Sequence, residues 1–149
     1  MNARRRLVSD SLAADLDLAR AHLAAHDLGM VIAQHGEILY ASAQPGVLSL
    51  LTAANGDRPI TGAALADRVV GRAAALVACD AGLAAVYGVV MSESALAQLT
   101  GAGIAASYGA LVPHVLNKPQ TDLCPLEKLT QGIDTPSDAV AALRTFTRR

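Results

Sequence analysis

The chain has 149 residues, of which 52% are hydrophobic, 17% are charged and 3% are aromatic. This length suits one domain with a substantial core, so we expect residues 1–149 to form a single domain, with residues 1–9 as a frayed tail. The 12 Lys and Arg residues against 13 Asp and Glu give a formal charge of −1, which favours neither nucleic acid nor an anionic membrane as a partner.

The elements predicted in the first third are a cover helix, a hairpin and a short helix. Asp10 or Ser11 can cap the cover helix, which runs to about Asp27 with apolar residues at helical spacing. His35-Gly36 separates two β-prone runs, and a two-residue connection that contains glycine favours a tight antiparallel hairpin. The two strands and the short helix are expected over residues 30–34, 37–41 and 47–54.

Helices and buried strands alternate in the rest of the chain. A long helix is predicted from a start between Thr61 and Ala66 to about Cys79. Of the two strands that follow, the first is apolar almost throughout, as expected for a strand covered on both faces, and Ser92 opens the helix between them. These strands and the two C-terminal helices are expected over residues 83–91, 104–112, 125–131 and 136–146. The order predicts a mixed sheet in a three-layer α/β/α sandwich.

Cysteine usage and hydropathy bear on the compartment. Cys79 and Cys124 are the only cysteines, and a core of this size does not need disulfides, so we expect a reducing cytoplasm. Polar residues interrupt the N-terminal segment, which argues against a signal peptide. The most apolar window, residues 73–91, contains Asp80 and two glycines, which argues against a membrane span.

Cys124 is the residue that points most directly to chemistry. A polar loop delivers it to the predicted start of a helix, where Pro125 suits the first helical position and Cys124 becomes the N-cap. The partly positive helix end would favour the thiolate, and Glu127 can reach back to a backbone N–H. His114 is the only histidine near enough in sequence to serve as a base. The alternative interpretation is an inert apolar residue under the loop.

Three other polar residues stand where helices are predicted to start. In open α/β sheets, ligands bind where strand ends meet helix starts. Asp67 lies in an apolar stretch, so it begins a helix, pairs with Arg68 or Arg72, or serves a site. Ser92 and Glu93 directly follow a buried strand. They either cap the next helix or bind a polar ligand group.

A series of short motifs follows the predicted elements along the chain. They are Gly36-Glu37-Ile38-Leu39, Gly62-Ala63, the run from Ala66 to Ala75, Ser92-Glu93, Val112-Pro113 and Cys124-Pro125-Leu126-Glu127-Lys128. This series resembles that of a small prokaryotic family of unknown function whose structural class is the cytidine-deaminase-like fold. The resemblance extends from about Leu12 to Phe146 and implies that fold, but the family's activity is unassigned, so it implies no reaction. Arg72 departs from the lysine usual in the family, which keeps the charge and excludes a Schiff base.

The chain lacks the zinc motifs that a deaminase needs. Zinc deaminases place a His or Cys two residues before a Glu at one helix start, and Pro-Cys-x-x-Cys at the next. The corresponding starts predicted here carry Asp67-Arg68-Val69 and Ser92-Glu93-Ser94-Ala95, and the two cysteines do not have metal-ligand spacing. His22 and His26 are one helical turn apart, but on the cover helix. We therefore expect neither a metal nor another cofactor.

We interpret the chain as a pocket-bearing protein that binds a small polar metabolite or nucleotide without zinc. Two alternatives remain open: a thiol-dependent enzyme that uses Cys124, and a non-catalytic interaction module that forms a homo-oligomer. Whether the protein is an enzyme stays undecided. The candidate catalytic residues are Cys124, Asp67 and Glu93, and the candidate ligand-binding residues are Ser92, Arg72, Asn117 and Lys128.

Overall fold

The computed structural model describes residues 3–44, 47–116, 122 and 124–147, and side chains over residues 10–146 of that part. Its sheet has the strand order β2-β1-β3-β4-β5, in which β1 runs antiparallel to β2 and β3, and β3, β4 and β5 run parallel. The strands are β1 (Met30–Gln34), β2 (Glu37–Ser42), β3 (Ala64–Val70), β4 (Ala85–Ser92) and β5 (Ala105–Val112).

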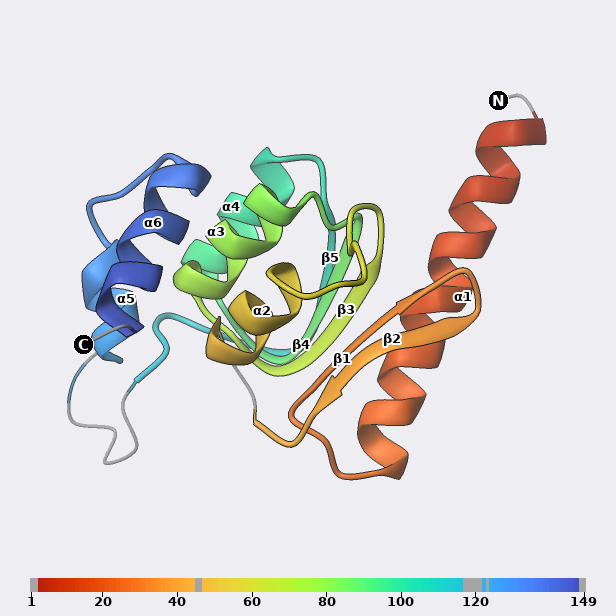
Figure 1. Ribbon diagram of the computed structural model, residues 1–149, viewed down its shortest axis with the longest axis horizontal. Coiled ribbons are helices and arrows are strands. Elements are labelled where there is room, and N and C mark those ends of the chain that lie inside the picture. The colour runs from red at the N-terminus through yellow and green to blue at the C-terminus, as the bar shows by residue number, and fades with distance from the viewer. Residues whose placement is uncertain (1–2, 45–46, 117–121, 123, 148–149) are drawn as a thin grey trace.

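The helices lie on both faces of this mixed sheet, as predicted (Figure 1). Helix α1 lies along one face, while the other helices occupy the opposite side, with α3 next to the sheet and α6 beyond it. The helices are α1 (Ala3–Ala25), α2 (Val47–Ala54), α3 (Arg72–Ala81), α4 (Glu93–Gly101), α5 (Pro125–Thr130) and α6 (Pro136–Thr147). The structure thus extends the cover helix through residues 3–9, which we had assigned to a frayed tail.

The predicted hairpin forms, and α1 holds it in place. His35 and Gly36 have φ angles of 53° and 75°, the positive values that a tight two-residue turn requires at both central positions. Both turn N–H groups donate to the carboxylate of Asp15, over 3.0 Å to Oδ2 and 2.9 Å to Oδ1. Asp15 is only 5% exposed, so it is a buried anchor and not the solvent-facing residue that helical periodicity suggests.

The long helix predicted from Thr61–Ala66 is wrong, because residues 64–70 form the central strand β3. This strand pairs with β1 on one side and β4 on the other, and the helix begins only at Arg72. Ala64, Leu65 and Ala66 are fully buried between the helical layers. An alanine-rich segment covered on both faces shows no alternation, so local propensity favours helix until pairing on both sides decides otherwise.

The core is built mainly from small aliphatic side chains. Helix α3 packs against α2, α4 and α6, and its alanines are buried on several sides. Because alanine adds little bulk, these helices approach one another and the sheet closely. A smaller cluster joins α1 to the opposite face through residues such as Ala19, Leu23 and Val31.

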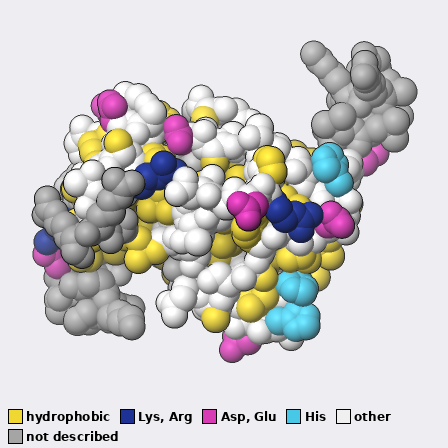
Figure 2. Space-filling view, viewed as in Figure 1, with side chains coloured by type: hydrophobic (Ala, Val, Ile, Leu, Met, Phe, Trp, Pro, Cys, Tyr) yellow, Lys and Arg dark blue, Asp and Glu magenta, His cyan; other side chains and the backbone are white. Residues whose placement is uncertain are grey.

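The surface shows no single dominant charge on the face drawn in Figure 2. Basic and acidic side chains are interspersed there, and the basic side chains do not gather into one patch. None of the helices in the described part of the chain combines the length and apolar composition needed to cross a bilayer.

Candidate functional site

The carboxyl ends of the three parallel strands meet at one edge of the sheet. β3 ends at Val70, β4 at Ser92 and β5 at Val112, and helices α3 and α4 begin at this edge. This is the place where ligands bind in open α/β sheets. The candidate residues can be judged by how they are arranged around it.

Glu127 of α5 caps the beginning of α3. The backbone N–H of Arg72 donates to Oε2 over 2.9 Å, and that of Ala73 donates to Oε1 over 3.2 Å. The residue at the N-cap of α3 is Gly71, which has no side chain that could accept hydrogen bonds from these N–H groups. A Cβ atom at Gly71 would lie 2.1 Å from Oε1 of Glu127, so the glycine leaves the space that the carboxylate occupies.

Burial dominates the electrostatics of Glu127. Desolvation raises the pKa of its carboxyl, while the two backbone hydrogen bonds and the charges of Arg72 and His114 lower it and offset only part of that effect. From the sequence, Glu127 is expected to act within its own helix. The structure corrects this, because its carboxylate reaches a helix that lies 54 and 55 residues earlier in the chain.

Arg72 ties the same helix start to the C-terminal segment. Its Nε donates to the Thr130 carbonyl over 3.1 Å, and Nη2 donates to the Ile133 carbonyl over 2.7 Å and to Asp134 over 2.9 Å. Nη1 donates to the Ser94 hydroxyl over 3.3 Å, and the side chain is 13% exposed. The guanidinium is therefore engaged by protein acceptors, and its predicted contact with a ligand stays a prediction.

A cavity of about 400 Å³ opens beside this helix start, between α2, α3 and α5. Apolar side chains form most of its lining, and the only described polar side chains among them are the Cys124 thiol and the Glu127 carboxylate. The lining residues are Val47, Leu48, Val69, Gly71, Ala73, Ala74, Val115, Cys124, Leu126 and Glu127. We name this space the β3-end cavity.

Cys124 stands at the N-cap of α5, as predicted, with Pro125 at the start of the helix. Its thiol makes no capping hydrogen bond, is half-buried and borders the β3-end cavity. The Cys124 N–H donates to the Val115 carbonyl over 3.1 Å. The segment that carries His114 therefore runs beside the cysteine. The charge of His114 also lowers the pKa of Glu127.

Asp67 is buried in the middle of the sheet. It lies in β3 with no exposed surface, so its predicted place at the start of a helix is wrong. Its Oδ1 accepts the Val69 N–H over 3.1 Å, and strand alternation puts its side chain on the same face as Leu65, which belongs to the larger core cluster. Its neighbour Val69 lines the β3-end cavity, whereas Asp67 is not among the lining residues.

The remaining candidates do not share the cavity in the described part of the chain. The Ser92 hydroxyl accepts the Ala95 N–H over 3.1 Å, which is the capping role, and Glu93 is exposed in the first turn of α4. Lys128 forms an ion pair with Asp122 at the surface. Asn117 lies outside the described residues. Of the six predicted site residues that the structure describes, Cys124 alone lines this cavity.

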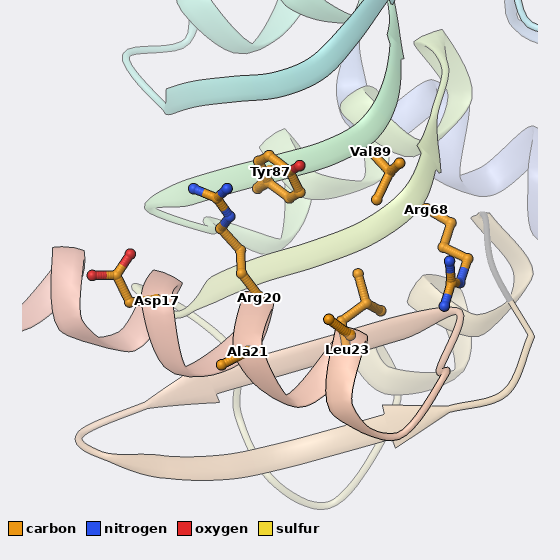
Figure 3. A pocket seen from close by; sticks show the side chains of 8 residues that line it. Asp17, Arg20, Ala21, Leu23, Arg68, Tyr87 and Val89 are labelled. Atoms are coloured by element: carbon orange, nitrogen blue, oxygen red, sulfur yellow. The ribbon is translucent and has the colours of Figure 1, made fainter.

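Two further groups of polar side chains involve helix α1. The rings of His22 and His26 on α1 have centroids 4.3 Å apart, and in the described residues no group of three or more His, Cys, Asp or Glu side chains is arranged to hold a metal. A groove of about 490 Å³ lies between α1 and β4 (Figure 3), where the Arg20 guanidinium sits 4.0 Å from the centre of the Tyr87 ring. Neither was predicted from the sequence as a binding site.

Comparison with solved structures identifies the class of fold. The chain is similar to the crystal structure of a DUF1893 family protein (TM1506) from Thermotoga maritima, with a TM-score of 0.81 and 24% identity over 88% of each chain. Similarity to dCMP deaminase from the cyanophage S-TIM5 is weaker. The apo form has a TM-score of 0.45 and the complex with dCMP and dUMP 0.44, both at 13% identity over 72% of this chain and 99% and 98% of theirs. The class is thus a mixed-sheet α/β fold that is shared with the DUF1893 family protein.

The family follows from the sequence itself. The model of the domain of unknown function DUF1893 (TM1506) matches residues 18–147, so this chain belongs to the DUF1893 family. The resemblance inferred from the motifs is thereby confirmed. A search of curated protein sequences found no match to the chain.

Proposed function

We propose that the protein binds a small molecule in the β3-end cavity, without zinc. The observation that supports this is a cavity of about 400 Å³ at the carboxyl end of β3, lined by apolar side chains and by two polar groups that converge from α5. Small-molecule sites usually combine a mostly apolar concave surface with a few fixed polar groups, at volumes of roughly this order.

The lining restricts the chemistry of the ligand. A flat or aliphatic body fits against Val47, Val69 and Ala74, and a hydrogen-bond donor fits the Glu127 carboxylate. No Lys or Arg belongs to the described lining, and Arg72 is already engaged by protein acceptors. We therefore favour a neutral or cationic metabolite, such as a nucleobase or nucleoside, over a nucleotide whose phosphate must be paired inside the cavity.

Filling the cavity tests the proposal. Ala74 is 3% exposed and lines the cavity, so Ala74→Leu occupies the space a ligand would use, whereas Ala97→Leu makes the same change at an exposed position of α4. A panel of nucleobases, nucleosides and nucleoside monophosphates is screened by thermal shift and NMR. We expect a compound that raises the Tm of the wild type and of Ala97→Leu but not of Ala74→Leu. Equal binding by Ala74→Leu, or no binding by any compound, contradicts the proposal.

A thiol-dependent enzyme is the second candidate, and the course of the chain beside Cys124 favours it. The segment 114–115 passes next to Cys124, which brings a histidine into the neighbourhood of the cavity. Alkylation of the native protein with iodoacetamide tests this, with Cys79 as the internal control, because burial raises the pKa of the Cys79 thiol. Fast modification of Cys124 that slows in His114→Ala supports a reactive thiol. Equal rates at both cysteines argue against it.

A further inference from the structure

Strand β5, one of the two outer strands of the sheet, has an edge that no strand of the described residues covers. It has eight residues, which span about 26 Å at the usual rise per residue. It hydrogen-bonds to β4 on one side, and no strand in the described part of the chain pairs with its other side. Such an edge presents a row of backbone donors and acceptors that can bind another strand.

Natural proteins often protect long edges with charged residues or proline, and β5 has neither. The sequence Ala-Ala-Ser-Tyr-Gly-Ala-Leu-Val contains no charged residue and no proline. Most of the strand is exposed, and its large residues Tyr108 and Leu111 are 42% and 38% exposed. Val89 of the neighbouring β4 is 37% exposed, so part of the exposed apolar surface of the molecule gathers at this side of the sheet.

The distribution of residue size along β5 makes the strand complementary to itself. A two-fold axis perpendicular to the sheet pairs β5 with its own copy in antiparallel orientation, and each residue then faces one with the same side-chain direction. With the axis at Tyr108, Leu111 faces Ala105, Ala110 faces Ala106, and Gly109 faces Ser107. The bulky Leu111 therefore lies opposite a small residue, and Val112 at the end of the strand faces Ile104, just outside it.

The residue at the axis also suits this pairing. Tyr108 would face its own copy, and cross-strand aromatic pairs stabilise antiparallel sheets. Because β5 carries no charge and the net charge of the chain is −1, the two copies do not repel each other along the strand. We infer that β5 is the interface of a homodimer in which two copies join edge to edge, so that their two five-stranded sheets become one continuous sheet.

The oligomeric state tests the interface directly. Tyr108→Lys introduces two facing positive charges at the axis, and Phe146→Lys makes a matched change on α6, where Phe146 is 40% exposed. By sedimentation equilibrium and light scattering, we expect the wild type and Phe146→Lys to be dimers, and Tyr108→Lys to be a monomer with an unchanged circular dichroism spectrum. A monomeric wild type, a dimeric Tyr108→Lys, or assemblies that keep growing with concentration would overturn the inference.

Cross-linking tests the register in a separate set of variants. In a background with Cys79→Ala and Cys124→Ala, Tyr108→Cys places two thiols at the axis, whereas Leu111→Cys places them six residues apart along the paired strands. Under oxidising conditions we expect a covalent dimer from Tyr108→Cys and none from Leu111→Cys. A dimer that forms with equal yield from both, or from neither, excludes this register. Neither test depends on the ligand proposed for the β3-end cavity.

Discussion

Asp15 and Glu127 have the same structural role in two separate regions of the molecule. Each carboxylate accepts two backbone N–H groups from an element distant in sequence: the hairpin turn at His35 and Gly36 in one case, and the start of α3 in the other. The donors are exposed turn residues in the first case, and in the second they include the buried Ala73, whose N–H would otherwise lack an acceptor.

The surroundings of these two carboxylates differ. Asp15 lies in the middle of a 23-residue helix and stabilises a turn. Glu127 belongs to a six-residue helix, borders the β3-end cavity and stands next to Arg72. The same hydrogen-bonding arrangement is thus only an anchor in one region and part of a candidate site in the other, which means that burial of a carboxylate alone does not identify function.

The largest effect is expected from Arg72→Ala. This change removes the donors to the Thr130 and Ile133 carbonyls and the link between α3 and the C-terminal segment, so we expect a loss of about 3 kcal/mol or more in the free energy of unfolding. Urea denaturation measures it. Arg72→Lys should restore only a minor part, because one ammonium cannot reach acceptors placed around a planar fork. A loss below about 1 kcal/mol contradicts a structural role for Arg72.

Asp15→Ala is expected to cost about 2 kcal/mol, because the His35 and Gly36 N–H groups lose their acceptor. The stability of Asp15→Asn, which keeps one acceptor oxygen, should lie between those of the wild type and Asp15→Ala. The matched control is Asp17→Ala, an exposed residue on the same helix, with an expected change within about 0.5 kcal/mol. Equal stabilities for Asp15→Ala and Asp17→Ala in urea denaturation would show that Asp15 does not anchor the hairpin in the way that Glu127 anchors α3.

Gly71→Ala should displace the Glu127 carboxylate without straining the backbone, since φ at Gly71 is −100°. We expect a loss of about 1–2 kcal/mol, similar to that of Glu127→Ala, as for the loss of a helix cap. The double variant should be little less stable than either single variant, because both remove the same interaction. Gly101→Ala, where the added Cβ meets open space, is the control and should not destabilise. Additive losses would show that the glycine and the carboxylate act independently.

The smallest effect is a difference in pH dependence. Because the pKa of Glu127 is raised in the folded protein, the stability that depends on its proton is fully present below the ordinary pKa of a glutamate and is lost as the pH rises through the folded-state pKa. The glutamine in Glu127→Gln cannot titrate, so the stability of this variant should not fall with rising pH in this way. Urea denaturation of both proteins between about pH 4 and pH 7 measures the difference. A wild type that loses stability with rising pH no faster than Glu127→Gln contradicts the raised pKa.

Local signals predicted the parts of the fold that local interactions determine. The hairpin turn follows from His35-Gly36, the start of α4 from Ser92, and the N-cap of α5 from Cys124-Pro125. Strand β3 could not be recognised in this way, because its alanine-rich sequence becomes a strand only when β1 and β4 pair with it on both sides.

The candidate site was only partly predictable for the same reason. Cys124 lines a cavity at the strand ends and its role there stays a prediction, whereas the contact of Glu127 with α3 was missed because its partners lie far away in the sequence. A signal existed at Gly71: a helix that starts after a glycine, without Ser, Thr, Asp or Asn to cap it, needs an acceptor from elsewhere. That signal can be recognised only when the boundary between β3 and α3 is placed correctly.

The dependence of α3 on Glu127 and Arg72 has a consequence for the synthesis of the protein. Domains generally begin to fold from the N-terminus while the chain is still being made. Here the start of the central helix obtains its acceptor at residue 127, and its arginine obtains acceptors at residues 130–134. A nascent chain that ends before these positions therefore has an uncapped α3, and this helix is completed only when the C-terminal segment has been made.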